Sequence, residues 1–128
     1  MPDRSSFDYA VLRIVPRVDR EEFVNAGLVL FCLGQKFLHA RVSIDEALVR
    51  SLYPDFDIDA ARRHLEAFPR IAAGDAGSGP VALLNQRQRF HWLTAPRSTV
   101  IQVSPVHSGI CEDARAEFDR LFQYLVLR

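Results

Sequence analysis

Residues 7–15 read FDYAVLRIV, and this stretch decides the fold because it is apolar on both of its alternating faces. One face carries Ala10, Leu12 and Ile14, and the other carries Tyr9, Val11 and Val15. Side chains alternate between the two faces of a strand, so a strand that is apolar on both faces is buried on both. The stretch therefore predicts the central strand of a sheet.

One charged residue, Arg13, interrupts the second face of that strand. A buried arginine requires a carboxylate or carbonyl partner, and removing one member of such a pair costs about 3 to 5 kcal/mol. Asn25 and Gly27 stand at the approach to the next apolar run. We expect Arg13, Asn25 and Gly27 to be structural residues.

The next elements follow from local patterns on the C-terminal side of Pro16. Asp19 and Glu22 form a capping pair, and Val18 and Phe23 occupy the two staple positions, so a short helix is expected to begin here and to end at Gly27. The apolar run Leu28–Leu33, a turn at 33–36 and the alternating stretch Phe37–Val42 predict an antiparallel hairpin. Its second strand is expected to be half exposed.

Two helices are predicted in the middle of the chain. The first follows the capping box Ser43-Ile44-Asp45-Glu46 and stops before Pro54. The second is capped by Asp57 and is broken or kinked at Pro69. Its apolar stripe consists of Ile58, Ala61, Leu65 and Phe68. Residues 74–80 are expected to form a loop, because they lack the Lys-Ser/Thr ending of a phosphate-binding loop.

The last third of the chain predicts a strand pair and a long helix. Arg89–Thr94 and Ser98–Val103 are interpreted as two strands joined at Ala95-Pro96-Arg97, and a helix is expected from about Glu112 to the C-terminus. Its apolar face repeats at helical spacing through Ala114, Phe118, Leu121, Phe122, Leu125 and Val126. The pattern as a whole predicts one α+β domain over residues 1–128, with an antiparallel sheet of four or five strands and a loose tail at 1–6.

Composition narrows the function classes. The 128 residues are 48% hydrophobic and carry a formal net charge of zero, so the field that attracts DNA or an anionic membrane surface is missing. The longest apolar run, 26–33, is too short to span a bilayer. Cys32 and Cys111 lack metal-ligand spacing, so they are interpreted as reduced core thiols in a cytosolic protein. No metal and no cofactor is expected.

Residues 76–111 contain no acidic side chain, and this segment is the local basic patch that the composition allows. An anion site is predicted here, with Arg97 as the main cation. His91, His107, Gln102 and Ser104 are expected to add contacts, and the site would bind phosphate or RNA weakly. A sharper alternative makes His91 and His107 the general base and acid of a phosphodiesterase, with Arg97 stabilising the developing charge. The third possibility is that these side chains are structural.

Two blocks of sequence, FDYAVLRIVPRVDREEFVNAGLVLFC and RFHWLTAPRSTVIQVSPVHSG, resemble the bacterial DUF3037 family, whose members are stand-alone domains of about this length. The most specific parts are Glu22-Phe23-Val24-Asn25 with Gly27, and Ser104-Pro105-Val106-His107 with Gly109. The resemblance extends from Phe7 to the C-terminal helix. It implies no catalytic residues, since the family has no established function, and it implies gene neighbours that encode HipA-like kinases, the toxin type of toxin–antitoxin modules.

Two function classes follow. The first is a small accessory or regulatory module that binds a protein partner, for which the resemblance suggests a HipA-like kinase. The second is a phosphate-handling or RNA-processing enzyme built on His91, Arg97 and His107. The balanced charge and the lack of a catalytic motif favour the first. Trp92, Tyr53 and Phe56 are the aromatic candidates for anchoring such a partner, although a place in the core is the slightly favoured interpretation of Trp92.

Overall fold

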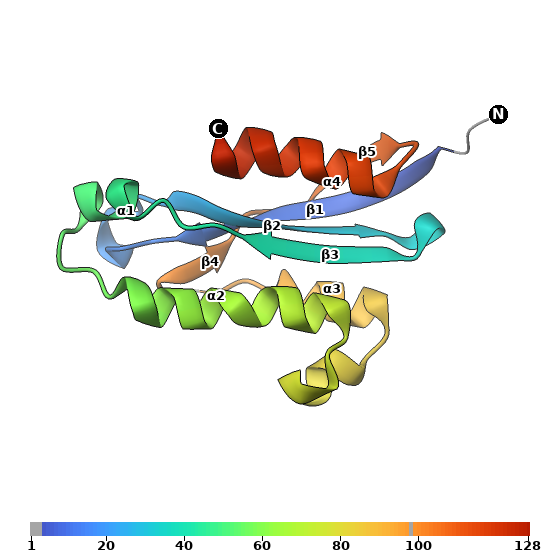
Figure 1. Ribbon diagram of the computed structural model, residues 1–128, viewed down its shortest axis with the longest axis horizontal. Coiled ribbons are helices and arrows are strands. Elements are labelled where there is room, and N and C mark those ends of the chain that lie inside the picture. Colours follow the sequence, from blue (N-terminus) through green and yellow to red (C-terminus); the bar gives the residue numbers. More distant parts are fainter. Residues whose placement is uncertain (1–3, 98) are drawn as a thin grey trace.

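The structure is a computed structural model and describes residues 4–97 and 99–128 (Figure 1). Its strands are β1 (Ser5–Ile14), β2 (Val24–Cys32), β3 (Phe37–Val42), β4 (Ile101–Val103) and β5 (His107–Cys111). Its α-helices are α1 (Glu46–Leu52), α2 (Ile58–Ala73), α3 (Gln86–Leu93) and α4 (Ala114–Phe122). The α+β class predicted from the sequence is confirmed.

All strand pairs are antiparallel, and β1 is central, as the FDYAVLRIV pattern predicts. On one side of β1 the order is β2 and then β3. On the other side two short strands share one edge: β4 pairs with the end of β1, where Arg13 lies opposite Gln102, and β5 pairs with its beginning, where Tyr9 lies opposite His107. Since β1 begins at Ser5, the expected loose tail does not extend to residue 6.

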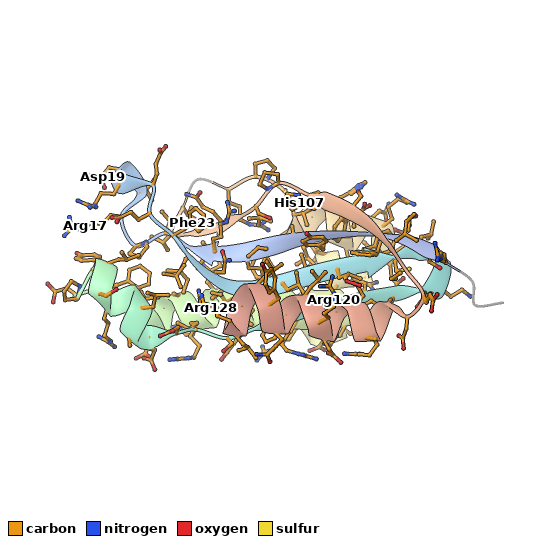
Figure 2. All side chains as sticks on the ribbon, turned by 90° about the horizontal axis from the view of Figure 1, so that it is seen from above. Arg17, Asp19, Phe23, His107, Arg120 and Arg128 are labelled. Carbon is orange, nitrogen blue, oxygen red and sulfur yellow. The ribbon has the colours of Figure 1, made fainter. Side chains whose placement is uncertain are left out.

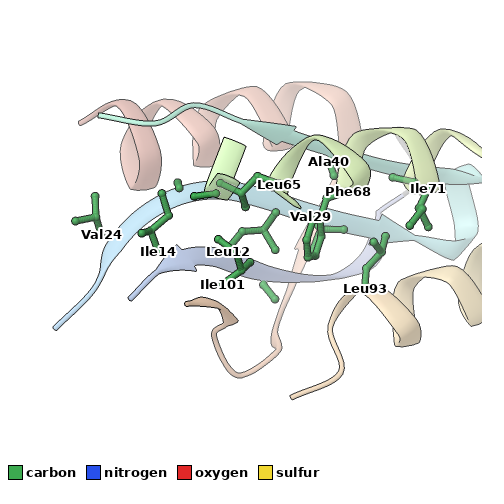
Figure 3. Packing of buried hydrophobic residues seen from close by; sticks show 14 of the residues in the cluster. Leu12, Ile14, Val24, Val29, Ala40, Leu65, Phe68, Ile71, Leu93 and Ile101 are labelled. Carbon is green, nitrogen blue, oxygen red and sulfur yellow. The ribbon is translucent and has the colours of Figure 1, made fainter. Parts of the chain in front are cut away.

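Helices cover both faces of the sheet, as Figure 1 shows: α2 and α3 lie on one side and α4 lies on the other. On the α2 side, Leu12 of β1 and Ile101 of β4 pack against Leu65 and Phe68 of α2 (Figure 3). The stripe predicted for the second helix is therefore confirmed. Asp57 caps α2 as expected, with its side chain accepting from the Ala60 amide.

The C-terminal helix begins with the cap residue Asp113 and covers part of the opposite face. Its predicted stripe is confirmed, since Phe118, Leu121, Phe122 and Val126 are buried against Leu28 and Leu30 of β2. The last turn, Gln123–Leu127, is π-helical. Because α4 lies over β2 and β3, the margin of β1 on this side is less covered, and Tyr9 and Arg13 are half-buried.

Cys32 and Cys111 are free and buried in the cluster under α4. Burial raises the pKa of the Cys111 thiol, and the neighbouring Cys32 adds to the effect. Among the described residues, no helix has the length and apolar character needed to cross a membrane.

The helix expected between Asp19 and Gly27 is wrong. Only the 3-10 turn Val18–Arg20 forms, Glu21 adopts a left-handed conformation (φ 59°), and β2 begins at Val24. Gly27 lies inside β2, where a Cβ would stand 2.9 Å from the Arg41 carbonyl oxygen and 2.9 Å from Leu12 Cδ1. The glycine is thus needed for close packing of β2, rather than for ending a helix.

A bulge next to Gly27 sets the orientation of the strand before it. The register places Leu12 opposite Gly27 but Arg13 opposite Asn25, so Ala26 is an extra residue in β2. Consequently Val24 joins the cluster on the α2 side. Asn25 lies on the α4 side, and its Nδ2 donates to the Leu125 carbonyl at 3.1 Å.

The strand expected at Arg89–Thr94 is also wrong, because these residues belong to α3 and its C-terminal cap. A capping box between Asn85 and Gln88 starts the helix, and Phe90 and Leu93, three residues apart, bury the same face. The strand expected at Ser98–Val103 is reduced to Ile101–Val103, and Ser98 lies outside the described residues.

Two smaller expectations about helix ends need correction. The cap of α1 is Asp45 rather than Ser43, and the Asp45 side chain accepts from the Leu48 amide. The second helix continues through Pro69 to Ala73, because Ile71 and Ala72 are buried in the same cluster as the earlier turns. It ends at Gly74 in a left-handed conformation.

Candidate functional site

Two arginines of the acid-free segment, Arg97 and Arg89, donate hydrogen bonds to the ends of helices. Arg97 donates from Nη1 to the Leu93 and Ala95 carbonyls, both at 2.9 Å, and from Nη2 to the Trp92 carbonyl at 3.1 Å, so it caps the end of α3. Arg89 likewise donates to the Ala72 carbonyl at the end of α2. Cations are favourable at these positions because the carbonyls there lack helical partners.

Ser104 and Gln102 take local roles at the sheet edge. The buried Ser104 hydroxyl accepts from the Val11 amide at 2.8 Å and donates to the Pro105 carbonyl at 2.9 Å, so it joins β1 to the chain between β4 and β5. Gln102 donates from Nε2 to the Thr99 carbonyl. Gln102 also lines a cavity.

The two histidines are not brought together. His91 is exposed on α3, which packs on the α2 side of the sheet. The His107 ring lies against Tyr9 in a tilted arrangement, with 5.3 Å between centroids, and Tyr9 packs on the cluster under α4. A general acid and a general base must both reach the same substrate atoms within about 3 Å, and the sheet separates these two side chains.

A cleft of about 370 Å³ lies at the end of β1, on the margin that α4 leaves uncovered. It is lined by Arg13, Val15, Val18, Glu21, Phe23, Arg97 and Gln102. We call it the Arg13 cleft. Figure 2 shows Phe23 beside the segment that carries Arg17 and Asp19, with His107 farther along β5. Gln102 pairs with Arg13 and His107 pairs with Tyr9, and these two positions lie four residue steps apart on β1, or about 13 Å at strand spacing.

Arg13 is the central side chain of this cleft. Its guanidinium carbon stands 4.0 Å from the centroid of the Phe23 ring, and its Nε is buried with no hydrogen-bond partner. Burial lowers the pKa of Arg13. The carboxylate or carbonyl partner expected from the sequence is absent, since no hydrogen bond or ion pair within residues 4–97 and 99–128 involves this guanidinium. A desolvated cation with unused donors is a favourable contact for an anion.

A second arginine in the cleft stacks on an exposed aromatic residue. The Arg97 guanidinium stands 5.1 Å from the centroids of both Phe68 and Trp92, and Trp92 is 43% exposed. Burial lowers the pKa of Arg97. Of the three aromatic anchors expected from the sequence, Trp92 is thus at the surface, whereas Phe56 is buried and Tyr53 is half-buried.

Four residues of the cleft, Val15, Val18, Glu21 and Phe23, were missed as site residues in the sequence. Val18 and Phe23 match a helical staple, yet they flank a turn and remain 44% and 47% exposed, with Glu21 between them. The useful signal was the pair of apolar residues enclosing the charged run Asp19-Arg20-Glu21-Glu22, next to a strand that carries an arginine. No group of three His, Cys, Asp or Glu residues that could hold a metal occurs in the described part of the chain.

A family model described as "Protein of unknown function (DUF3037)" matches residues 9–126. No curated protein and no solved structure matches the chain. The two motifs on which the family resemblance rests lie on either side of β1, on β2 with the residues before it and on the segment that leads into β5.

Proposed function

This chain belongs to the DUF3037 family, and we propose that it is a small accessory or regulatory module that binds a protein partner through the Arg13 cleft. One observation carries the proposal: the half-buried Arg13 guanidinium stacks on the exposed Phe23 ring and has no ion-pair partner in the described structure. Arginine and aromatic side chains contribute most of the binding energy at protein interfaces.

The chemistry of the cleft favours a protein over a nucleic acid. A nucleic-acid surface needs many cations along a continuous path, because affinity grows with the number of phosphates that are neutralised. Here Arg89 and Arg97 are committed to helix ends, Glu21 lines the cleft, and the whole chain has no net charge. Within the described part of the acid-free segment, Arg89 and Arg97 are therefore poor candidates for the weak RNA binding expected from the sequence.

The phosphodiesterase alternative is not our proposal. It requires His91 and His107 on one substrate, and they lie on opposite sides of the sheet. Arg97, its third member, is bonded to three backbone carbonyls.

A HipA-like kinase is the partner that we propose to test first, because the family resemblance suggests such gene neighbours. The chain should be co-expressed with the kinase encoded beside it and separated by size-exclusion chromatography. We expect a stable complex that is lost in the double variant Arg13→Gln, Phe23→Ser, because these substitutions remove the stacked pair.

The matched control is Leu83→Ser, which changes an equally apolar residue, 71% exposed, on the connection between α2 and α3. This variant should keep the complex. A complex that survives the double variant and fails with Leu83→Ser would place the interface on the other side of the molecule. Absence of a complex with the wild-type chain would remove this kinase as the partner.

A further inference from the structure

We propose that the Arg13 cleft binds a single carboxylate group carried on an apolar body. This inference rests on the proposed function and adds the chemical class of the group that the partner presents. It follows from three features of the cleft: its charge, its free donors and its apolar walls.

The charge of the cleft matches a monoanion. Two guanidinium groups, those of Arg13 and Arg97, and one carboxylate, that of Glu21, line it. One positive charge is therefore uncompensated. A carboxylate neutralises that charge, whereas a phosphate monoester carries about −1.5 to −2 charges at pH 7 and would leave an excess of negative charge beside Glu21.

The free donors also suit a carboxylate. Arg97 has already donated three hydrogen bonds to the Leu93, Ala95 and Trp92 carbonyls. The Arg13 guanidinium makes no hydrogen bond to the described residues; its Nε is buried against the stacked Phe23 ring, so its two Nη groups are the donors left for a ligand. A planar guanidinium donates two parallel bonds to a planar carboxylate, so one arginine is sufficient for this ligand.

The walls of the cleft explain why the carboxylate should have an apolar body. Val15 is buried, and Val18 and Phe23 expose nearly half of their surface beside the guanidinium. A volume of about 370 Å³ lies at the low end of ligand sites, which suits one amino-acid residue or a short organic acid. The C-terminal residue or an acidic side chain of a partner protein has this chemistry, and so does a free short-chain acid.

The test uses NMR titration of the full chain and follows the Nε–Hε resonance of Arg13. N-acetyl-leucine represents a protein C-terminus, the α-amide of N-acetylglutamate an acidic side chain, and butanoate a free acid. Inorganic phosphate tests the competing anion class, and N-acetyl-leucinamide lacks the carboxylate. We expect saturable shifts with at least one N-acetylated acid and at least five-fold weaker binding of phosphate. N-acetyl-leucinamide should produce no saturable shift.

Three variants sharpen the result. Arg13→Gln should weaken carboxylate binding at least ten-fold, and Arg63→Gln, on the exposed face of α2, should leave it unchanged. Glu21→Gln changes an exposed side chain, so it keeps the fold, and it makes the cleft doubly positive. Its phosphate binding should therefore tighten more than its carboxylate binding.

The outcomes separate the ligand class from the function. Phosphate binding as tight as that of the N-acetylated acids, or carboxylate binding that persists in Arg13→Gln, would overturn the carboxylate inference. If butanoate binds and neither N-acetylated acid does, the ligand is a free acid and the protein-partner function loses its support. If no carboxylate shifts Arg13 while the kinase complex still depends on Arg13 and Phe23, the function stands and this inference fails.

Discussion

The two faces of the sheet are built differently, and the difference separates residues that stabilise the fold from residues that are free to bind. On the α2 side, β1 contributes Ala10, Leu12 and Ile14, and all three are fully buried beneath helices. On the α4 side Phe7 and Val11 of the same strand are also buried, but Tyr9 and Arg13 are only half-buried because α4 lies over β2 and β3. Apolar side chains on a sheet are stabilised by burial beneath helices. The partly exposed Arg13 at the margin of β1 is accessible to a ligand.

The largest expected loss of stability comes from removing the C-terminal helix α4. A chain that ends at Cys111 lacks Phe118, Leu121 and Phe122, each worth roughly 1.5 to 3 kcal/mol when buried, against a total stability of about 5 to 15 kcal/mol. We expect this truncation to lose cooperative unfolding in a circular dichroism melt. A chain that ends at Val126 keeps the stripe, so its midpoint should stay near that of the full chain. Equal midpoints for both truncations would show that the α4 side contributes nothing to the core.

Substitution of one glycine on each side of the sheet, Gly27 and Gly109, tests how rigidly the two faces are packed. A Cβ at Gly27, on the α2 side, would meet the Arg41 carbonyl oxygen, which is backbone and cannot turn away. A Cβ at Gly109, on the α4 side, would meet the end of the Phe7 ring at 2.7 Å, and a ring can shift. We expect Gly27→Ala to cost about 1 to 3 kcal/mol in urea denaturation and Gly109→Ala to cost less.

The control for both substitutions is Gly77→Ala, since the nearest atom to a Cβ there is 3.5 Å away. Its stability should equal that of the wild type. If Gly109→Ala is the more damaging variant, the α4 side is packed as rigidly as the α2 side, and the contrast between the faces is wrong.

The elements that could be predicted from the sequence are those with a local pattern. The alternation in residues 7–15 and 37–42 predicts β1 and β3, and the spacing in residues 114–126 predicts the final helix, because each signal is local. The pattern at 89–94 failed because Phe90 and Trp92 alternate as in a strand, while Phe90 and Leu93 are spaced as in a helix. The capping box of Asn85 and Gln88 decides between the two structures.

The site was harder to predict because its members meet only in three dimensions. Arg13 and Gln102 are opposite each other through strand pairing, and the bulge at Ala26 sets which face the residues before it occupy. The sequence identified Arg97 and Gln102 as candidates for anion binding, and both line the cleft. It assigned Arg13 a structural role, since nothing local shows that a guanidinium in an apolar strand lacks a carboxylate or carbonyl partner.

The two arginines of the cleft, Arg97 and Arg13, should differ in how much they contribute to the stability of the fold. Arg97→Gln removes three hydrogen bonds to backbone carbonyls at the end of α3, of which the Trp92 carbonyl still accepts from the Ala95 amide, and we expect it to cost about 1 to 3 kcal/mol. Arg13→Gln removes no hydrogen bond in the described structure, so its cost should remain below about 1 kcal/mol. Urea denaturation of both variants measures the difference. A larger loss for Arg13→Gln would make that residue a structural anchor, as the sequence first indicated.

The smallest expected effect concerns His39, which lies on β3 beneath α4. Its ring packs against that of Phe118 in a T-shaped arrangement, with 4.8 Å between the ring centroids, and burial lowers the pKa of His39. The nearby cations Arg115 and Arg41 lower the pKa further, while Asp119 opposes them. The unfolded chain, with an ordinary histidine pKa of about 6.5, then binds a proton more readily than the folded chain.

The contribution of His39 to stability is therefore complete above about pH 6.5 and decreases as the pH falls below that value toward the lower pKa of the folded state. We expect the urea midpoint to fall between pH 7.5 and pH 5.5, a window in which most carboxylates stay ionised. The variant His39→Gln should flatten this slope, whatever its absolute stability, and His91→Gln, on the exposed face of α3, should retain it. An unchanged slope in His39→Gln would mean that the histidine is hydrated in the folded protein, and that α4 covers β3 less closely than its contact with Phe118 indicates.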